Sequence, residues 1–228
     1  MTGSLGGRRV VVTRAADQAS KLADRLRDLG ATVVLVPTIR FEPAPFVLPD
    51  GLDWVVVTSP NGVAALTDLG TARLAVIGPG TADAARAAGF SVSLIPARAL
   101  AESLVEEFAS GPGRVAVVQA DIARGVAVDG LRAKGWDVTA VTAYRTLAVD
   151  AEPTLSDAIA SADAITFTSG STVRSFVAAY GVDRLPGSVI SIGPVTTNAC
   201  ADLGISVTLT ASEHNIDGLV AATVESLR

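Results

Sequence analysis

The residues of this chain that are best suited to chemistry lie in short polar turns that follow apolar, β-branched runs. Each turn is built from small, hydroxyl-bearing or glycine residues, and each opens a stretch with helical spacing. Free backbone N–H groups and the helix dipole make such turns suitable binding sites for anions. The candidate binding residues in these turns are Arg14, Thr58, Ser59, Gly78, Thr81, Gln119, Ser169, Gly170, Ser171, Gly193 and Thr196.

Ordinary helix capping also explains any single one of these turns, because Ser, Thr and Asp cap helices throughout proteins. Four of the turns, however, stand at matching positions in two halves of the sequence. Ligands of open parallel sheets bind beyond the carboxyl ends of the strands, where all of these turns are expected. The sequence therefore predicts a shared cleft for a ligand that bears several carboxylates or phosphates.

The composition limits the other kinds of catalysis open to the chain. One cysteine, Cys200, excludes an intrachain disulfide, and one histidine, His214, excludes a multi-His metal site and disfavours a Ser-His-Asp triad. The segment Gly78–Asp83 has Asp where a dinucleotide fingerprint has its third glycine, and Ser59 and Ser169 lack a Gly-x-Ser-x-Gly elbow. We therefore expect neither a metal nor a cofactor.

The charge balance and hydropathy limit the partners. The 228 residues include 18 Lys and Arg and 23 Asp and Glu, a formal net charge of −5, which argues against a general nucleic-acid binder. No apolar run approaches the roughly 20 residues that span a bilayer, and Met1–Arg9 lacks the apolar core of a signal peptide. We expect a cytoplasmic protein that binds neither nucleic acid nor membrane and that is a monomer.

Strands and helices alternate along the sequence. Apolar β-branched runs predict strands over 9–13, 33–36, 54–57, 73–77, 91–95, 114–118, 137–142, 164–167, 188–192 and 205–209. Helical spacing predicts helices over 17–29, 61–69, 80–88, 100–109, 123–134, 171–180, 195–203 and 215–227. Strands that are apolar on both faces and alternate with amphipathic helices indicate an α/β fold of parallel sheets flanked by helices.

The sequence also repeats itself in the order A, B, A′, B′. The matching segments are 9–40 with 114–145, 53–66 with 163–176, and 77–104 with 192–219. The first match aligns Arg9 with Arg114, and the second aligns Asp53 with Asp163. The repeat predicts two lobes of similar design, and it leaves open whether A pairs with B or with B′.

Tyr144 is a further candidate, because it stands directly after a predicted strand. The chain has only two tyrosines. A phenol at a strand end can serve as an acid that faces a cleft, or it can pack at a junction between domains. The residues alone leave both interpretations open.

A series of motifs runs along nearly the whole chain, from about Arg8 to Leu227. These motifs are Val11-Val12-Thr13-Arg14, Asp53-Trp54-Val55-Val56-Val57-Thr58-Ser59-Pro60-Asn61-Gly62-Val63, Ile77-Gly78-Pro79-Gly80-Thr81, Gln119-Ala120-Asp121-Ile122-Ala123-Arg124, Ala143-Tyr144-Arg145-Thr146, Ile165-Thr166-Phe167-Thr168-Ser169 and Ile192-Gly193-Pro194-Val195-Thr196. In this order and spacing, they resemble the uroporphyrinogen-III synthase family.

The resemblance implies two similar α/β lobes, each a parallel sheet flanked by helices, joined by a double chain crossing. Lobe 1 is expected to combine residues 1–38 with 150–228, and lobe 2 to be continuous over 42–146. The linkers between the lobes are expected at 39–41 and 147–149. This arrangement pairs A with B′ and B with A′.

The resemblance also implies the reaction, which closes hydroxymethylbilane to uroporphyrinogen III with inversion of the terminal pyrrole ring and loss of water. The substrate is a linear tetrapyrrole rich in carboxylates, which suits turns that bind anions. Tyr144 matches the family tyrosine thought to assist departure of the hydroxyl group, and Ser59, Thr81, Ser169 and Thr196 match positions that line the family cleft. We also expect transient contact with the enzyme that supplies hydroxymethylbilane.

Two other classes of protein use similar architectures. A two-lobed, non-catalytic binding or sensor protein for an anionic small molecule has the same kind of cleft, and catalytic turnover separates it from an enzyme. A flavodoxin-like or receiver-like pair of domains is the other class. A receiver needs acidic residues at its strand ends, where this sequence has Thr-Ser and Gly-Pro.

Overall fold

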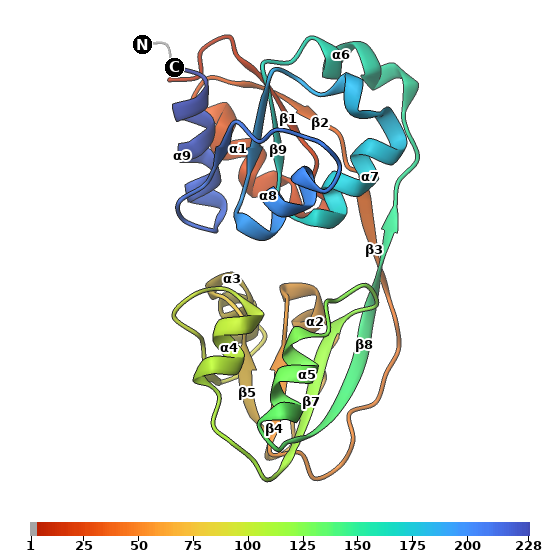
Figure 1. The fold of residues 1–228 in the computed structure, drawn as a ribbon, viewed down its shortest axis with the longest axis vertical. Helices are drawn as coiled ribbons and strands as arrows, with labels where there is room; N and C mark the ends of the chain where they lie inside the picture. The colour runs from red at the N-terminus through yellow and green to blue at the C-terminus, as the bar shows by residue number, and fades with distance from the viewer. Residues whose placement is uncertain (1–3) are drawn as a thin grey trace. The chain divides into compact units, whose positions relative to one another are not determined.

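The chain forms two compact units, shown in Figure 1. The structure is a computed structural model that describes residues 4–228. The first unit comprises the chain up to Arg40 together with Leu147–Arg228, and the second is the continuous segment Phe41–Thr146. Residues 1–3, which the sequence prediction assigns to lobe 1, lie outside the described residues. Within the described range, no helix is both long and apolar enough to cross a membrane.

The first unit is built on a five-stranded parallel sheet in the order β11-β10-β9-β1-β2. Its strands are β1 (Arg9–Val12), β2 (Thr32–Leu35), β9 (Ala164–Phe167), β10 (Ser188–Ser191) and β11 (Leu209–Thr210). One face packs against α1 (Ser20–Asp28) and α9 (Ile216–Ser226), and the other against α6 (Ser156–Ala160), α7 (Gly170–Tyr180) and α8 (Pro194–Ala201). Short 3-10 helices lie at Ala16–Gln18, Pro153–Leu155 and Val182–Arg184.

The second unit is built on a six-stranded sheet in the order β3-β8-β7-β4-β5-β6. Its strands are β3 (Ile39–Pro43), β4 (Trp54–Val57), β5 (Arg73–Val76), β6 (Val92–Leu94), β7 (Arg114–Ala120) and β8 (Asp137–Ala148). One face packs against α2 (Pro60–Ala64) and α3 (Pro79–Ala87), and the other against α4 (Ala101–Glu107) and α5 (Val126–Ala133).

The central strands are mostly apolar because both of their faces are covered. In β4, Val55 and Val57 belong to the core under α2 and α3, whereas Trp54 and Val56 belong to the core under α4 and α5. Successive strand residues point to opposite faces, so a strand between two helical layers has no position for a solvated polar side chain. The predicted α/β fold of parallel sheets flanked by helices is confirmed.

The predicted linkers, 39–41 and 147–149, lie largely within strands rather than loops. The Ala44 N–H donates to the Ala143 carbonyl and the Val149 N–H donates to the Thr38 carbonyl, each at 2.9 Å. Residue numbers rise on one strand as they fall on the other, so β3 and β8 run antiparallel. The sequence prediction ended β8 at residue 142, because polar residues such as Arg145 and Thr146 interrupt the apolar run beyond it.

Other element boundaries differ from the predictions where a tight turn ends an element or where the element itself is very short. The helix predicted over 61–69 ends at Ala64, and the Asp68 carboxylate then accepts the Gly70 N–H at 2.9 Å in a tight turn. The strand predicted over 205–209 is wrong except at Leu209, because β11 covers only Leu209–Thr210. Helix α6 was not predicted, because a five-residue helix is too short to show a helical period.

The sequence repeat corresponds to a matching contact at the amino edge of each sheet. In the first unit, the Arg9 N–H donates to Asp163 Oδ2 at 2.7 Å. In the second, the Arg114 N–H donates to Asp53 Oδ2 at 2.8 Å. These are the residues that the repeat aligns, so the contact joins segment A to B′ in one unit and A′ to B in the other.

We expect Asp163→Ala to lower the free energy of unfolding at neutral pH by about 1 kcal/mol, the usual size of a partly exposed charge-assisted contact. The Arg9 N–H, and to a smaller extent the Arg8 guanidinium at 3.0 Å, hold the pKa of Asp163 below its ordinary value of 3.8. The carboxylate therefore stabilises the fold above pH 3.8 and loses this effect as the pH falls through its lower folded-state pKa. Urea unfolding of the parent protein and of Asp163→Ala, at pH 7 and at pH 3, measures the loss in the free energy of unfolding at each pH. A loss that does not shrink at the lower pH would contradict this assignment.

Candidate active site

Tyr144 lies at the carboxyl edge of the second sheet, where side chains from three separate segments meet. Its side chain is buried, with 8% exposed, and its hydroxyl lies 2.7 Å from Ser59 Oγ. The ring of Phe41 meets the tyrosine ring edge-on, with 5.6 Å between ring centroids. The phenol is therefore fixed by a polar contact at its tip and an aromatic contact along its body.

A β-bulge in β8 turns Tyr144 toward Ser59. The pairing between β7 and β8 shifts by one residue between Gln119 and Ala120, which leaves Ala143 as the extra residue. By regular alternation, Tyr144 would share the face of Val138, in the core under α4 and α5. It packs instead in the core under α2 and α3. The bulge has redirected the side chain, as bulges near functional sites commonly do.

The surroundings of Tyr144 keep its hydroxyl protonated. Burial is the main cause that raises the pKa of Tyr144 above its ordinary value, and the charge of Asp121 raises it further. The hydrogen bond with Ser59 acts in the opposite direction, because it stabilises a phenolate. A neutral phenol with a partner that can stabilise its conjugate base is suited to donate a proton to a departing group.

The repeat places a second serine, Ser169, at the position equivalent to Ser59, and the two hydroxyls are used differently. Ser169 Oγ accepts the Thr172 N–H at 3.2 Å and so caps α7, and it also bonds to Ser171 Oγ at 2.8 Å. Ser59 precedes α2 without a side-chain capping bond. One serine of the repeat thus stabilises its own helix, and the other holds the phenol of Tyr144.

The remaining candidates in the second unit lie along the same carboxyl edge. The Thr58 hydroxyl donates to the Val118 carbonyl at 3.4 Å, and Gln119 is a half-buried residue near the end of β7. Gly78 precedes α3, and Thr81 is buried in the first turn of that helix. These residues border one stretch of sheet edge, but only Ser59 touches Tyr144 through a hydrogen bond among those predicted.

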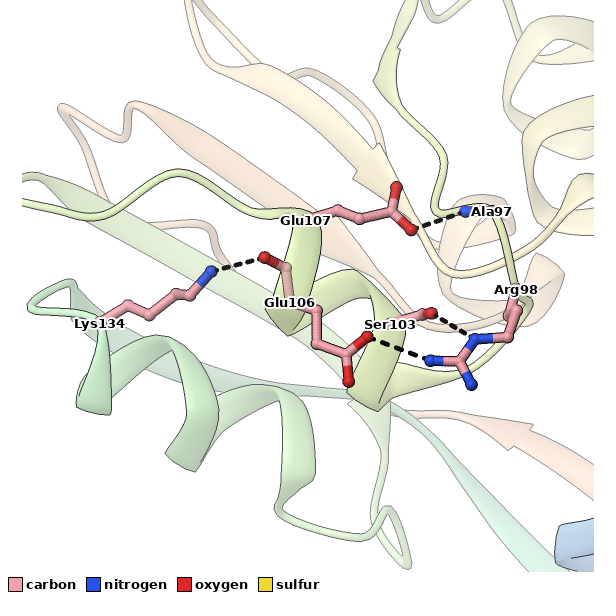
Figure 2. Close-up of polar contacts among 6 residues, drawn as sticks. All are labelled: Ala97, Arg98, Ser103, Glu106, Glu107 and Lys134. Atoms are coloured by element: carbon pink, nitrogen blue, oxygen red, sulfur yellow. Dashed lines mark hydrogen bonds and ion pairs between the residues drawn. The ribbon is translucent and has the colours of Figure 1, made fainter.

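The loop before α4 packs tightly over Gly78. A Cβ atom added to Gly78 would lie 3.0 Å from the Cβ of Ala99, so the turn accepts only glycine without a shift of this loop. Polar contacts from α4 hold the loop, and Lys134, the residue after α5, holds the end of α4, as Figure 2 shows. The contacts are Ala97 N–H to Glu107 (2.9 Å), Arg98 to Ser103 and to Glu106 (3.1 Å each), and Lys134 to the Glu106 carbonyl (2.9 Å).

Arg14 is the charged candidate in the first unit, two residues after the end of β1. Its guanidinium donates to Gln18 Oε1 at 3.2 Å. Burial is the main cause that lowers the pKa of Arg14, and the nearby charge of Asp17 partly offsets it. A cation that has lost part of its hydration gains more from an anionic ligand than a fully solvated one does.

The glycine turns of the first unit are also closely packed. A Cβ atom on Gly170 would lie 3.0 Å from the Cβ of Ala199, and one on Gly193 would lie 3.0 Å from the ring of His214. Thr196, in the first turn of α8, is buried, with 3% exposed. The predicted residues therefore fall into two sets. The first unit holds Arg14, Ser169, Gly170, Ser171, Gly193 and Thr196, and the second holds Thr58, Ser59, Gly78, Thr81, Gln119 and Tyr144.

Sequence reasoning missed a hydroxyl cluster at the carboxyl edge of the first sheet. Thr197 Oγ1 lies 2.6 Å from Ser191 Oγ and 2.7 Å from Thr210 Oγ1. The neighbouring Thr196 was selected by its place in the repeat, yet Thr197 makes these contacts. In the sequence, only the adjacent threonines, Thr196 and Thr197, hinted that Thr197 could take part in such a cluster. Phe41 was missed as well, because nothing in the local pattern relates it to Tyr144.

Comparisons with known proteins agree on one family. The family model described as "Uroporphyrinogen-III synthase HemD" matches residues 20–221. Uroporphyrinogen-III synthase from Synechococcus elongatus is 32% identical over 250 aligned residues, covering 95% of this chain and 94% of the relative. The same enzyme from Chlorobaculum parvum is 27% identical over 243 residues, covering 96% and 99%.

Solved structures share the fold. A mutant uroporphyrinogen-III synthase from Thermus thermophilus matches with a TM-score of 0.67 at 19% identity, covering 97% of this chain and 99% of that one. The enzyme from Helicobacter pylori also matches with a TM-score of 0.67, at 17% identity and with coverage of 97% and 100%. At these identities, the likeness supports the architecture alone.

Proposed function

Because the chain belongs to the uroporphyrinogen-III synthase family, we propose that the hydroxyl of Tyr144 assists its chemical step as a general acid. The enzyme is a lyase of porphyrin biosynthesis that closes hydroxymethylbilane to uroporphyrinogen III, with inversion of the terminal pyrrole ring and loss of water. The departing group is a hydroxyl, which leaves far more readily as water than as hydroxide. A proton donor at that oxygen is therefore the simplest contribution a side chain can make.

In the proposed mechanism, Tyr144 donates its proton as the C–O bond of the hydroxymethyl group breaks. The electron-rich pyrrole supplies the electron pair and becomes an azafulvene cation. Attack by a substituted carbon of the terminal ring gives a spiro intermediate, which fragments and recloses with that ring inverted. The ring carbon that finally forms the macrocycle loses a proton, and this proton restores the phenol. Ser59 stabilises the phenolate between these two transfers through its 2.7 Å contact.

The candidate turns of both units are proposed to bind carboxylates of the substrate. Support comes from the backbone N–H groups at the starts of α3, α7 and α8, from the small residues that the packing requires there, and from Arg14. In this proposal the protein mainly positions a flexible chain, so that attack at the substituted carbon outcompetes direct closure to the type I isomer.

The observation that carries the proposal is the buried, protonated phenol of Tyr144 against Ser59, in a chain of this family. The test is a coupled assay in which the preceding enzyme produces hydroxymethylbilane from porphobilinogen in the presence of this protein. After oxidation, chromatography separates the porphyrin isomers. Mostly type III product is expected. Type I product alone, as in the control without protein, would leave a non-catalytic binding protein for an anionic small molecule as the better account.

We expect Arg14→Ala to raise KM about tenfold to a hundredfold with little change in kcat, as loss of one charge-assisted contact predicts. Thermal stability should stay the same or rise slightly, because a partly buried guanidinium carries a desolvation cost. Arg27→Ala is the matched control, since Arg27 is an exposed arginine of the same unit that pairs with Asp24 at 2.9 Å. Steady-state kinetics on both variants measures the effect, and equal KM values would remove Arg14 from the substrate site.

We also propose that the chain is a cytoplasmic monomer that makes transient contact with the enzyme supplying hydroxymethylbilane. The buried, unpaired Cys200, whose pKa burial raises to about 11, fits a reducing compartment. The substrate closes to the type I isomer when free, so rapid handover between the two enzymes favours the type III product. Light scattering at a mass near 23.1 kDa would support the monomer, and a doubled mass would contradict it.

A further inference from the structure

We infer that Asp121 is a positioning residue, which holds the bulge of β8 and thereby keeps the phenol of Tyr144 against Ser59. This inference rests on the proposed role of Tyr144 in the chemical step. Asp121 is exposed and follows the last residue of β7 directly, so its own backbone and side chain are free to continue the pairing with β8.

Two hydrogen bonds from Asp121 bracket the residue that follows Tyr144. The Asp121 N–H donates to the Tyr144 carbonyl at 3.1 Å, and the Thr146 N–H donates to Asp121 Oδ1 at 3.0 Å. The same carboxylate oxygen accepts the N–H of Ile122 at 3.0 Å, which fixes the side chain in this orientation. The carboxylate thus takes the place that a strand carbonyl would occupy, one residue beyond the end of β7.

The two hydrogen bonds that Asp121 makes with Tyr144 and Thr146, together called the clamp, lie where a bulge interrupts the pairing between β7 and β8. A bulge leaves one residue unpaired and disrupts the local ladder, here at Ala143. The strand β7 ends at Ala120, whereas β8 continues to Ala148. Without the Asp121 carboxylate, the backbone bond to the Tyr144 carbonyl would remain, but the Thr146 N–H would lose its partner at the point where the register has just shifted.

The position of the clamp has a direct consequence for the phenol. A shift of one residue in register moves a strand side chain to the other face of its sheet. For Tyr144, the other face belongs to the core under α4 and α5, away from Ser59. Loss of the carboxylate bond to Thr146 should therefore let the bulged segment shift and misplace the acid, without removing any group proposed to bind carboxylates. The charge of Asp121 also contributes to the raised pKa of Tyr144.

The test uses Asp121→Ala and Asp121→Asn in the full-length chain. The asparagine variant keeps an oxygen that can accept the Thr146 N–H, and the alanine variant does not. We expect Asp121→Ala to lower kcat about tenfold with KM within about twofold, because a small misplacement of a reacting group is costly. Asp121→Asn should restore kcat to within about threefold of the parent enzyme.

A second readout follows Tyr144 independently of activity. Tyrosine labelled with carbon-13 at Cζ gives two NMR signals in this chain, and the Tyr180→Phe variant assigns them. We expect Asp121→Ala to shift or broaden the Tyr144 signal and to leave the Tyr180 signal in place. Asp68→Ala is the matched control. Its carboxylate accepts the Gly70 N–H at 2.9 Å in the same unit, in a loop that precedes β5, and neither kcat nor the Tyr144 signal should change.

The positioning role is overturned if Asp121→Ala leaves the Tyr144 signal unchanged, or if Asp121→Asn lowers kcat about tenfold or more relative to the parent enzyme. The second result stays informative even if the alanine variant does not fold. Failure of the proposed acid role is a separate outcome. In that case Tyr144→Phe keeps full activity, while the NMR signal still reports whether Asp121 holds the ring.

Discussion

Tyr144→Phe should lower kcat about tenfold to a hundredfold, at or below the lower end of what general acid catalysis contributes in enzymes. The effect is limited because an electron-rich pyrrole already drives loss of the hydroxyl group. The phenylalanine ring keeps the contact with Phe41, so KM should change by less than about threefold. At low protein concentration, spontaneous closure should outcompete the slowed enzyme, and the type I fraction should rise. A higher concentration of the variant should restore the type III isomer.

The other tyrosine supplies the control for this experiment. Tyr180 lies at the end of α7 in the first unit, and its hydroxyl accepts the Glu152 N–H at 3.0 Å. Tyr180→Phe should therefore retain the parent kcat and isomer purity. Rates and isomer ratios for both variants come from the coupled assay. A Tyr144→Phe enzyme with the parent kcat would show that the hydroxyl leaves without help from this phenol.

Phe176→Ala should lower the free energy of unfolding of the first unit by about 3–5 kcal/mol, the usual cost of removing a buried aromatic ring. Phe176 is fully buried, and its ring lies 5.7 Å from Phe167 and 5.3 Å from Tyr180 between ring centroids. Few rearrangements can fill a cavity enclosed by two other rings and a sheet. Phe176→Leu keeps most of the volume and should cost less than about 2 kcal/mol.

Two spectroscopic probes can localise this loss, because both tryptophans, Trp54 and Trp136, lie in the second unit. Tryptophan fluorescence therefore reports on that unit, whereas far-UV circular dichroism reports on the helices of both. In Phe176→Ala, the dichroism transition in urea should begin earlier, and the fluorescence midpoint should stay close to that of the parent protein. Equal shifts of both transitions would mean that the two units unfold together.

The sequence was most informative where a pattern depends on burial alone. The run Trp54-Val55-Val56-Val57 predicted a strand covered on both faces, and the two cores on either side of β4 confirm this prediction. Repeat arithmetic aligned Asp53 with Asp163, and both make the same contact with an arginine backbone. Local pattern and repetition therefore predicted the buried strands, the likeness of the two lobes and the positions of the polar turns. The pairing of A with B′ and of B with A′ came from the family resemblance.

The site depends on pairing between segments that are far apart in the sequence, and there the sequence was less informative. Nothing in Ala143-Tyr144-Arg145 reveals a bulge, because the register shift is a property of two strands together. Ser59 and Ser169 occupy aligned positions, yet one contacts Tyr144 and the other caps its helix. Their difference arises from what lies opposite each serine, which only the folded chain determines.

The division of the first unit into two pieces of chain has a consequence for synthesis on the ribosome. Strand β1 is translated early, but one of its two neighbours, β9, begins only at Ala164. The whole of the second unit, Phe41–Thr146, is translated in between. The apolar strand β1 must therefore wait with one edge unpaired while the later unit completes its sheet. A nascent chain halted after Thr146 would contain every residue of the second unit but only the first of the two pieces of the first unit.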